Sequence, residues 1–251
     1  KVMKLKSIVG IIPLFAVESI KADMFESLPD FKERLEFFLK EKPKIASLVS
    51  SWIKPGHEKR RLFALLRGHR MKSILQKMLD PNEFLSDYGI RSLSKFHLKK
   101  PYSVKINGEL LTVRYTPGES DSLMFGGNSN WRGPIWFPIN HLIIESLRKF
   151  DYYYGGEFSI EYPTGPGNYV TMDLIAKELS LRCIKLFLPD ENGNRPVYAH
   201  YEKFQKDPHF KDHILFYEYF HGDNGRGLGA SHQTGWTGLV AEMIHKYYKP
   251  V

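Results

Sequence analysis

The sequence predicts a mainly α-helical protein that carries one small β-hairpin. In several separate stretches, apolar residues recur at the three- and four-residue spacing of an amphipathic helix. Only one stretch alternates apolar and polar residues, and it does so on both sides of an Asn-Gly pair. Long segments rich in glycine, proline and aromatic residues separate the helical stretches. A helical scaffold whose loops carry the chemistry fits this pattern, and a toroid of helices would be one such scaffold.

The first apolar stretch, residues 7–17, follows three lysines, Lys1, Lys4 and Lys6, and therefore imitates a secretory signal. It lacks a clear pair of small residues at a cleavage position before Glu18. We therefore predict a buried helix here, which the chain enters in the middle of a longer protein.

Five further helices are predicted from the spacing of apolar residues. They lie at residues 31–38, 71–79, 141–150, 172–187 and 236–244. Pro81 stops the second of these helices, and Thr171 is a candidate N-cap of the fourth. The hairpin is predicted from residues 102–106 and 109–115, because Asn107-Gly108 between them favours a type I′ turn.

Composition limits the class of protein. The chain has 251 residues, 42% of them hydrophobic and 14% aromatic, which suits a folded protein with a sizeable core. No apolar run approaches the roughly 20 residues of a membrane-spanning helix, so we expect no membrane partner. The single cysteine, Cys183, favours a reducing compartment, and we expect a cytoplasmic protein. The net charge of +8 is spread among acidic neighbours without a nucleic-acid-binding motif, so we expect no nucleic-acid partner either.

Residues 125–140 form the segment richest in groups that could bind a sugar. The indoles of Trp131 and Trp136 could pack on the C–H face of a sugar ring. Four polar side chains of the segment could hydrogen-bond its hydroxyls: Asn128, Asn130, Arg132 and Asn140. A structural loop whose indoles fill the core would explain the same residues equally well.

A second segment, residues 216–236, contains a candidate general base. Glu218 is flanked by aromatic residues that could desolvate its carboxylate, and such a group can accept a proton from water. A structural glutamate paired with an arginine is the alternative. The glycines between Gly225 and Gly229 lack the Gly-Lys-Ser/Thr ending of a phosphate-binding loop, which argues against a nucleotide.

A third segment, residues 82–94, contains Asp87, Tyr88 and Arg91, which could line a polar pocket. Alternatively, Asp87 and Arg91 could simply pair with each other on the surface. The histidines lack the spacing of a zinc site, so we expect neither a metal nor a cofactor.

Together these segments resemble glycoside hydrolase family 63. Asn130-Trp-Arg-Gly-Pro-Ile-Trp136 is similar to the family's Trp-Arg-Gly-Pro-x-Trp signature. Glu218-Tyr-Phe, followed by His232-Gln-Thr-Gly-Trp236, resembles its carboxyl-terminal catalytic block, and Asp87-Tyr-Gly-Ile-Arg91 resembles the preceding active-site loop. The blocks occur in the family's order and cover most of residues 85–245.

The resemblance implies the second half of an (α/α)6 toroid, with the β-hairpin as a small insertion. Residues 1–251 would then be the carboxyl-terminal part of a single catalytic domain. It also implies a carbohydrate substrate, whose α-glucosidic or α-mannosidic bond is hydrolysed with inversion, and assigns Glu218 as general base. The candidate substrate-binding residues are Asp87, Tyr88, Trp131, Arg132, Trp136, Asn140, His232, Gln233 and Trp236.

One expected group has no counterpart in the chain. The family's general acid is an aspartate in a Gly-Leu/Met-Asp-type loop of the first half of the barrel, and no such motif occurs here. We therefore expect the acid, and the remaining half of the domain, upstream of Lys1. The alternative is a non-catalytic carbohydrate-binding or scaffold protein that lacks the acid.

Overall fold

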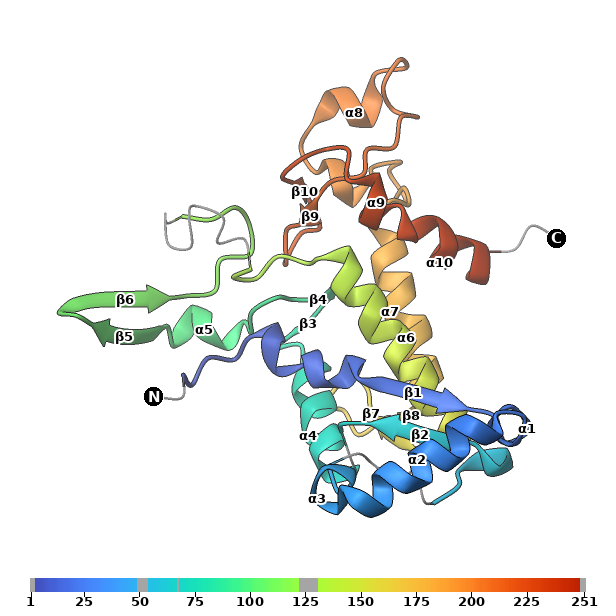
Figure 1. The fold of residues 1–251 in the computed structure, drawn as a ribbon. Helices are drawn as coiled ribbons and strands as arrows, with labels where there is room; N and C mark the ends of the chain where they lie inside the picture. The colour runs from blue at the N-terminus through green and yellow to red at the C-terminus, as the bar shows by residue number, and fades with distance from the viewer. Residues whose placement is uncertain (1–2, 49–53, 67, 122–130, 249–251) are drawn as a thin grey trace.

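The computed structural model describes residues 3–48, 54–66, 68–121 and 131–248, and within them the protein is mainly helical (Figure 1). Its two longest helices, α6 (Phe137–Tyr154) and α7 (Met172–Lys185), pack side by side and carry much of the core. A third helix, α10 (Leu239–Tyr247), packs against both of them. Helices α6 and α7 confirm the helices predicted at 141–150 and 172–187.

The ends of α6 and α7 follow from local chemistry. Thr171 caps α7, because its side-chain oxygen accepts a hydrogen bond from the Leu174 N–H at 3.3 Å. Helix α6 begins four residues before the predicted start, with Pro138 in its first turn, where a missing N–H costs nothing. It ends at Gly155, which takes up a left-handed conformation with φ of 62°.

The amino-terminal apolar stretch does not form the predicted helix. Residues 7–17 make two short 3₁₀ turns, η1 (Ile8–Gly10) and η2 (Ile12–Phe15), and then enter strand β1 (Val17–Ile20). Pro13 removes a backbone donor, and the many β-branched residues weaken helix formation. The expectation of burial was correct in part, since Ile8, Ile11 and Leu14 are at most 4% exposed.

Strand β1 pairs antiparallel with β2 (Arg61–Ala64), Val17 facing Ala64 across the pair. Between these strands lie α1 (Ala22–Glu26), α2 (Pro29–Glu41), α3 (Pro43–Ala46) and η3 (His57–Lys59). Helix α2 confirms the prediction at 31–38, although none of its residues is fully buried.

Helix α4 (Gly68–Met78) confirms the predicted helix at 71–79, and its stripe of Met71, Leu75 and Met78 is completely buried. After the short α5 (Phe96–Lys99), the predicted hairpin forms from β5 (Tyr102–Ile106) and β6 (Glu109–Val113). Its turn uses positive φ at Asn107 and Gly108, as a type I′ turn requires. In Figure 1 this ribbon projects from the body of the protein.

The expectation of a single β segment was wrong. Five antiparallel strand pairs occur among the described residues, four of them outside the predicted hairpin. Besides β1–β2, these are β3 (Leu85–Ser86) with β4 (Gly89–Ile90), β7 (Ser159–Glu161) with β8 (Tyr169–Thr171), and β9 (Tyr219–Phe220) with β10 (Gly227–Leu228). In the last three pairs each strand has only two or three residues, too few to leave an alternating pattern in the sequence.

The remaining elements are η4 (Pro196–Tyr198), α8 (Glu202–Lys206) and α9 (Thr234–Thr237). The helix predicted at 236–244 is thus divided, because α9 ends at Thr237 and α10 begins at Leu239, with Gly238 between them. None of the helices in the described part of the chain combines the length and apolar character of a membrane span. The toroidal arrangement of the helices stays a prediction.

Candidate active site

The three sequence blocks meet at one residue, Ile135. Its N–H donates to the Phe220 carbonyl at 2.8 Å, and its carbonyl accepts the Phe220 N–H at 2.9 Å. On its other side Ile135 forms an antiparallel bridge with Arg91. Since Phe220 also pairs with Gly227, four segments line up in the order Arg91, Ile135, Phe220, Gly227. Backbone pairing therefore brings together blocks that lie far apart along the chain.

Glu218 lies immediately before β9, where a glycine offsets the pairing of the hairpin. Tyr219 faces Leu228, but the Glu218 N–H reaches past Gly229 to the carbonyl of Ala230 at 2.8 Å. Gly229 allows this step because its φ is +69°, a conformation that glycine adopts at little cost. The result is a short, closed hairpin that ends at Glu218.

The Glu218 carboxylate rests on the opposing backbone. Its Oε2 accepts a hydrogen bond from the Ala230 N–H at 3.3 Å, and a Cβ added to Gly229 would lie 2.6 Å from the same oxygen. The residue is only partly buried. In the part of the chain that the structure describes, no ion pair involves Glu218, so the alternative of a structural glutamate paired with an arginine is not seen.

Four aromatic side chains beside Glu218 form a cluster, which we call the aromatic stack: Trp131, Trp136, Tyr219 and Trp236. Trp136 is at its centre, parallel to Trp131 at 4.3 Å and stacked on Tyr219 at 4.9 Å between ring centroids. Trp236 meets Trp136 edge to face at 6.0 Å. Trp136 is therefore 5% exposed, whereas Trp131 is 41% exposed and offers ring surface to a ligand.

Helix α9 attaches the aromatic stack to the main chain of Glu218. The indole N–H of Trp236 donates to the Glu218 carbonyl at 3.1 Å, and the Thr237 hydroxyl donates to the Tyr217 carbonyl at 2.6 Å. Gln233 and His232 precede this helix. The Gln233 N–H donates to the Phe216 carbonyl at 2.7 Å, whereas His232 is exposed.

Arg132 and Asn140 are both buried but differ in how their polar atoms are used. Arg132 is 4% exposed and lies 3.7 Å from Asp121 through Nη1, while its Nε and Nη2 have no hydrogen-bond partner among the described residues. The Asn140 amide is fully engaged. Its Oδ1 accepts the Ile90 N–H at 2.7 Å, and its Nδ2 donates to the carbonyls of Ile90 and Trp136. Asn140 thus joins α6 to β4. Asn128 and Asn130 lie outside the described residues.

The predicted pair of Asp87 and Arg91 does not form. Asp87 is exposed and lies 3.4 Å from Arg182, so the surface-pair alternative with Arg91 was wrong. Tyr88 packs against Gly225 of the hairpin turn, where an added Cβ would lie 2.9 Å from its ring. Burial, followed by the nearby Asp87 carboxylate, raises the pKa of Tyr88.

Arg91 instead joins a partly buried polar cluster with Asp223 and Tyr115, a role that the sequence did not reveal. Asp223 Oδ1 accepts hydrogen bonds from Arg91 Nη2 at 3.0 Å and from the Tyr115 hydroxyl at 2.9 Å. Burial alone would raise the pKa of Asp223, but these two hydrogen bonds and the positive charges of Arg91 and Lys95 together outweigh it and lower the pKa. Burial raises the pKa of Tyr115, so its hydroxyl keeps the proton that it donates.

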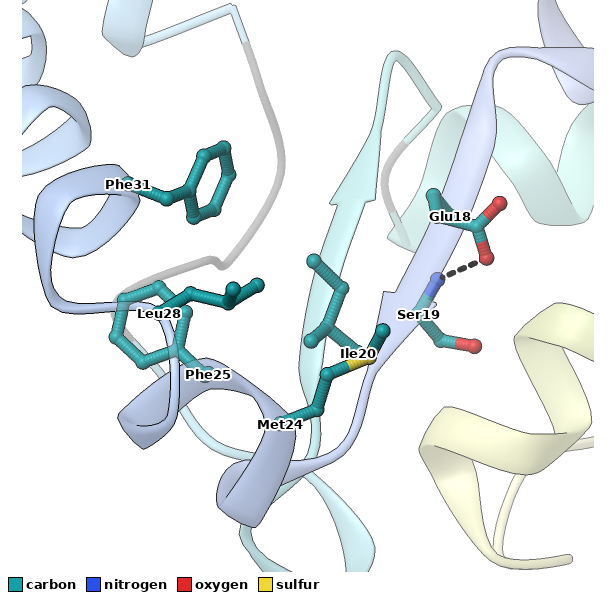
Figure 2. Close-up of a pocket in the computed structure, with 7 residues that line it drawn as sticks. All are labelled: Glu18, Ser19, Ile20, Met24, Phe25, Leu28 and Phe31. Carbon is teal, nitrogen blue, oxygen red and sulfur yellow. Dashed lines mark hydrogen bonds between the residues drawn. The ribbon is translucent and has the colours of Figure 1, made fainter.

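An apolar pocket lies apart from this site. No group of three or more His, Cys, Asp or Glu side chains that could hold a metal occurs among the described residues. Figure 2 shows a pocket of about 440 Å³ between β1, α1 and the start of α2, lined mainly by apolar side chains such as Met24, Phe25 and Phe31. In Figure 1 these elements lie at the opposite end of the protein from β9 and β10.

Comparison with known proteins relates the chain to carbohydrate-active enzymes. Residues 65–162 match the glycosyl hydrolase family 63 C-terminal domain, a range that includes Trp131 and Asn140 and ends before Glu218. The chain is 27% identical over 179 residues to a mannosyl-oligosaccharide glucosidase of Saccharomyces cerevisiae, covering 71% of this chain and 15% of the relative. It is 26% identical over 183 residues to a probable mannosyl-oligosaccharide glucosidase of Schizosaccharomyces pombe, covering 71% and 16%.

A further relative is the uncharacterized protein YMR196W of Saccharomyces cerevisiae, which is 49% identical over 245 residues, 96% of this chain and 22% of the relative. The chain thus spans about a fifth or less of the length of the curated relatives that it matches. The match to the family's domain and the two glucosidase relatives agree with the three blocks that meet at Ile135. This chain is therefore a relative of glycosyl hydrolase family 63, a family of glycosidases.

Proposed function

We propose that this chain is part of an inverting α-glycoside hydrolase in which Glu218 is the general base. The observation that carries the proposal is the position of the Glu218 carboxylate, which is partly exposed and free of any ion pair among the described residues. One of its oxygens is held by the Ala230 N–H, and its main chain is fixed by Trp236. A carboxylate held by a backbone N–H, on a main chain that bonds to an indole, is suited to take a proton from water next to a bound sugar.

The proposed binding surface is built from the aromatic stack and its neighbours. Trp131 would pack against the C–H face of a sugar ring, because its ring is the most exposed of the aromatic stack. Trp236 would form a second wall next to Glu218. Arg132, with two buried nitrogens that lack partners among the described residues, would hydrogen-bond an oxygen of the substrate. Asn140 and Trp136 would not need to contact the ligand. Asn140 would support the backbone of the site, and Trp136 would support the rings that bind the sugar.

In the proposed reaction a water molecule lies between Glu218 and the anomeric carbon. Glu218 accepts one proton from this water while the water oxygen bonds to the anomeric carbon and the bond to the leaving oxygen breaks. A second carboxyl group must donate a proton to that leaving oxygen, and an inverting enzyme places the two carboxyl groups roughly 6.5–9.5 Å apart. We propose that this acid comes from outside residues 1–251, since the relatives are several times longer than the region they share with this chain.

The proposed substrate is an α-linked glucoside of an oligosaccharide. The names of two relatives, both mannosyl-oligosaccharide glucosidases, support the α-glucosidic bond. An α-mannosidic bond is the alternative within the same proposal, and the two are separated by assaying α-glucosides and α-mannosides in parallel.

The decisive experiment is Glu218→Gln, assayed in the full-length protein on both kinds of substrate. Glutamine keeps the shape of the side chain but cannot accept the proton, so turnover should fall by about 10²–10⁴-fold while the substrate still binds. Glu202→Gln is the matched control, since Glu202 is exposed and, among the described residues, forms its ion pair with Lys206. Near-normal turnover by Glu218→Gln would reject the assignment.

The anomer released by the wild type tests inversion separately. Hydrolysis of an α-bond should give the β-sugar first, which proton NMR detects before mutarotation. If the wild-type protein binds oligosaccharides and hydrolyses none of them, the non-catalytic carbohydrate-binding alternative is correct.

A further inference from the structure

We propose that Asp223 and Arg91 are positioning residues, which fix the register of the hairpin that carries Glu218 and thereby hold this general base in place. The inference rests on the proposed function for its catalytic part. Its structural part rests only on contacts within the described residues.

Backbone pairing alone leaves this register weakly determined. Strands β9 and β10 have two residues each, and a single residue, Ile135, pairs with β9 on its other side. Because side chains alternate along a strand, a slip of one residue would exchange the sides on which Glu218 and Tyr219 lie. Such a slip would remove Tyr219 from Trp136 and move the Glu218 carboxylate away from the Ala230 N–H that holds it. Something beyond the few backbone hydrogen bonds is needed to prevent it.

The turn of the hairpin supplies that constraint through Asp223. Its Oδ1 accepts from Arg91 Nη2 at 3.0 Å and from the Tyr115 hydroxyl at 2.9 Å, and Lys95 Nζ lies 3.5 Å away. The Arg91 side chain is itself held by two further hydrogen bonds and by burial. Its Nε donates to the Tyr115 hydroxyl at 2.9 Å, its Nη1 donates to the Leu85 carbonyl, and its side chain is 6% exposed. A rigid, buried guanidinium therefore fixes one end of the hairpin.

The rest of the turn directs Asp223 toward this guanidinium. His221 Nδ1 accepts the N–H groups of Asp223 and Asn224 at 3.2 and 3.3 Å, so the ring proton belongs on Nε2. The Gly222 N–H donates to the Pro117 carbonyl at 2.8 Å, which anchors the turn to the segment that carries Tyr115. Arg91 also pairs with Ile135 through its backbone. The same arginine thus fixes both Ile135, the partner of β9, and Asp223, the end of β9's turn.

The test combines hydrogen exchange with kinetics on Asp223→Asn in the full-length protein. Asparagine keeps the size of the side chain but loses its charge, so the backbone N–H groups of Glu218 and Phe220 should exchange about tenfold faster, whereas those of α6 stay unchanged. On an α-glycoside substrate, kcat should fall about 10- to 100-fold while KM changes less than about threefold, because misplacing the base affects the chemical step more than binding.

Tyr115→Phe is the milder variant, since it removes the hydroxyl that bonds to Asp223 and to Arg91 Nε but leaves the ion pair between Arg91 and Asp223. It should change exchange and kcat in the same direction by a smaller factor. Glu145→Gln is the control, because it removes a comparable ion pair, to Arg148 within α6, that does not contact the hairpin. It should alter neither exchange at Glu218 nor kcat.

Two results would overturn the inference. One is unchanged exchange at Glu218 and Phe220 in both folded variants. The other is faster exchange spread equally over α6 and α7, which would indicate general loss of stability and no specific role in register. A wild-type protein that hydrolyses no glycoside would remove the proposed function, and the exchange comparison would still decide whether Asp223 fixes the hairpin.

Discussion

The indole N–H of Trp236 and the backbone carbonyl of Glu218 are joined by a 3.1 Å hydrogen bond. Trp236 also meets Trp136 edge to face, so one side chain links the candidate base to the aromatic stack. The ring that would wall the sugar and the main chain that would present the carboxylate therefore move together. A ligand that displaces the Trp236 ring would therefore also displace the main chain of Glu218.

Trp236→Phe should separate these two roles. Phenylalanine keeps an aromatic ring near Trp136 but leaves the partly buried Glu218 carbonyl without its donor, which costs about 1 kcal/mol. The melting temperature should fall by about 2–4 °C, as expected for a chain of this size. We expect kcat to fall about tenfold from the loosened base. Calorimetry and steady-state kinetics check the two effects, and an unchanged kcat would show that the hydrogen bond does not position Glu218.

Gly229→Ala should displace the Glu218 carboxylate. A methyl group at this position would lie 2.6 Å from Oε2, so the carboxylate must leave the Ala230 N–H. Gly193→Ala is a matched control, because Gly193 has a similar φ of +79° and open space around its missing Cβ. Both variants pay about 1–2 kcal/mol of backbone strain, but only Gly229→Ala should lose activity, by about 10²-fold. Equal activity losses in the two variants would contradict the prediction.

Trp131→Ala should weaken ligand binding with little loss of stability. Trp131 is 41% exposed, and removing a stacking ring of this kind costs about 1 kcal/mol of binding free energy, or about fivefold in affinity. Phe37→Ala makes a similar change on α2, where Phe37 is 66% exposed and lies at the other end of the protein. Titration calorimetry with an oligosaccharide should show weaker binding for Trp131→Ala alone.

Two aspartates should affect stability with opposite pH dependence. Burial would raise the pKa of Asp223, but hydrogen bonds from Tyr115 and Arg91 and the charges of Arg91 and Lys95 together lower it in the folded state. Its contribution to stability is therefore present above its unfolded pKa and is lost as the pH falls through the folded pKa. The pKa of Asp151 is raised, chiefly by burial, so its contribution is present at low pH and is lost as the pH rises through the folded pKa.

Asp223→Asn should therefore lower the melting temperature at pH 7 and have little effect in acid, where the wild type has already lost the contribution. After allowance for solvent screening we expect about 1 kcal/mol at neutral pH. Asp151→Asn should leave stability at pH 7 unchanged or raised. Melting curves of both variants and the wild type, measured from acid to neutral pH, check the direction of each effect. A loss of stability at pH 7 in Asp151→Asn would contradict the prediction, because it would show that the ionised carboxylate stabilises the fold.

Long elements of this fold could be predicted from the sequence because their signals are local. The 3.6-residue stripe of α4, the Thr171 cap of α7 and the Asn107-Gly108 turn each contain the physical reason for the element within a few residues. The helix predicted for residues 7–17 was wrong, because apolar content predicts burial but does not by itself distinguish a helix from short turns. Pro13 was the local sign against a helix.

The sequence predicted those site residues whose type alone suggests a role, such as a glutamate for proton transfer and a tryptophan for stacking on a sugar. Glu218, Trp131 and Trp236 do lie near one another around the aromatic stack, and their part in catalysis stays a prediction. The partnership of Arg91 with Asp223 could not be predicted, because it depends on two segments that meet only through Ile135. The sequence does not encode such long-range pairs in any local pattern.

Because the pairing around Ile135 gathers its partners from distant parts of the chain, the arrangement of Glu218 and the aromatic stack is not expected in a partly folded intermediate. Each of these contacts closes a long loop, and contacts of that kind are entropically costly and form late. Ligand affinity would consequently appear only in the last stage of folding. Binding a ligand would in turn shift the whole folding equilibrium and not merely tighten one loop.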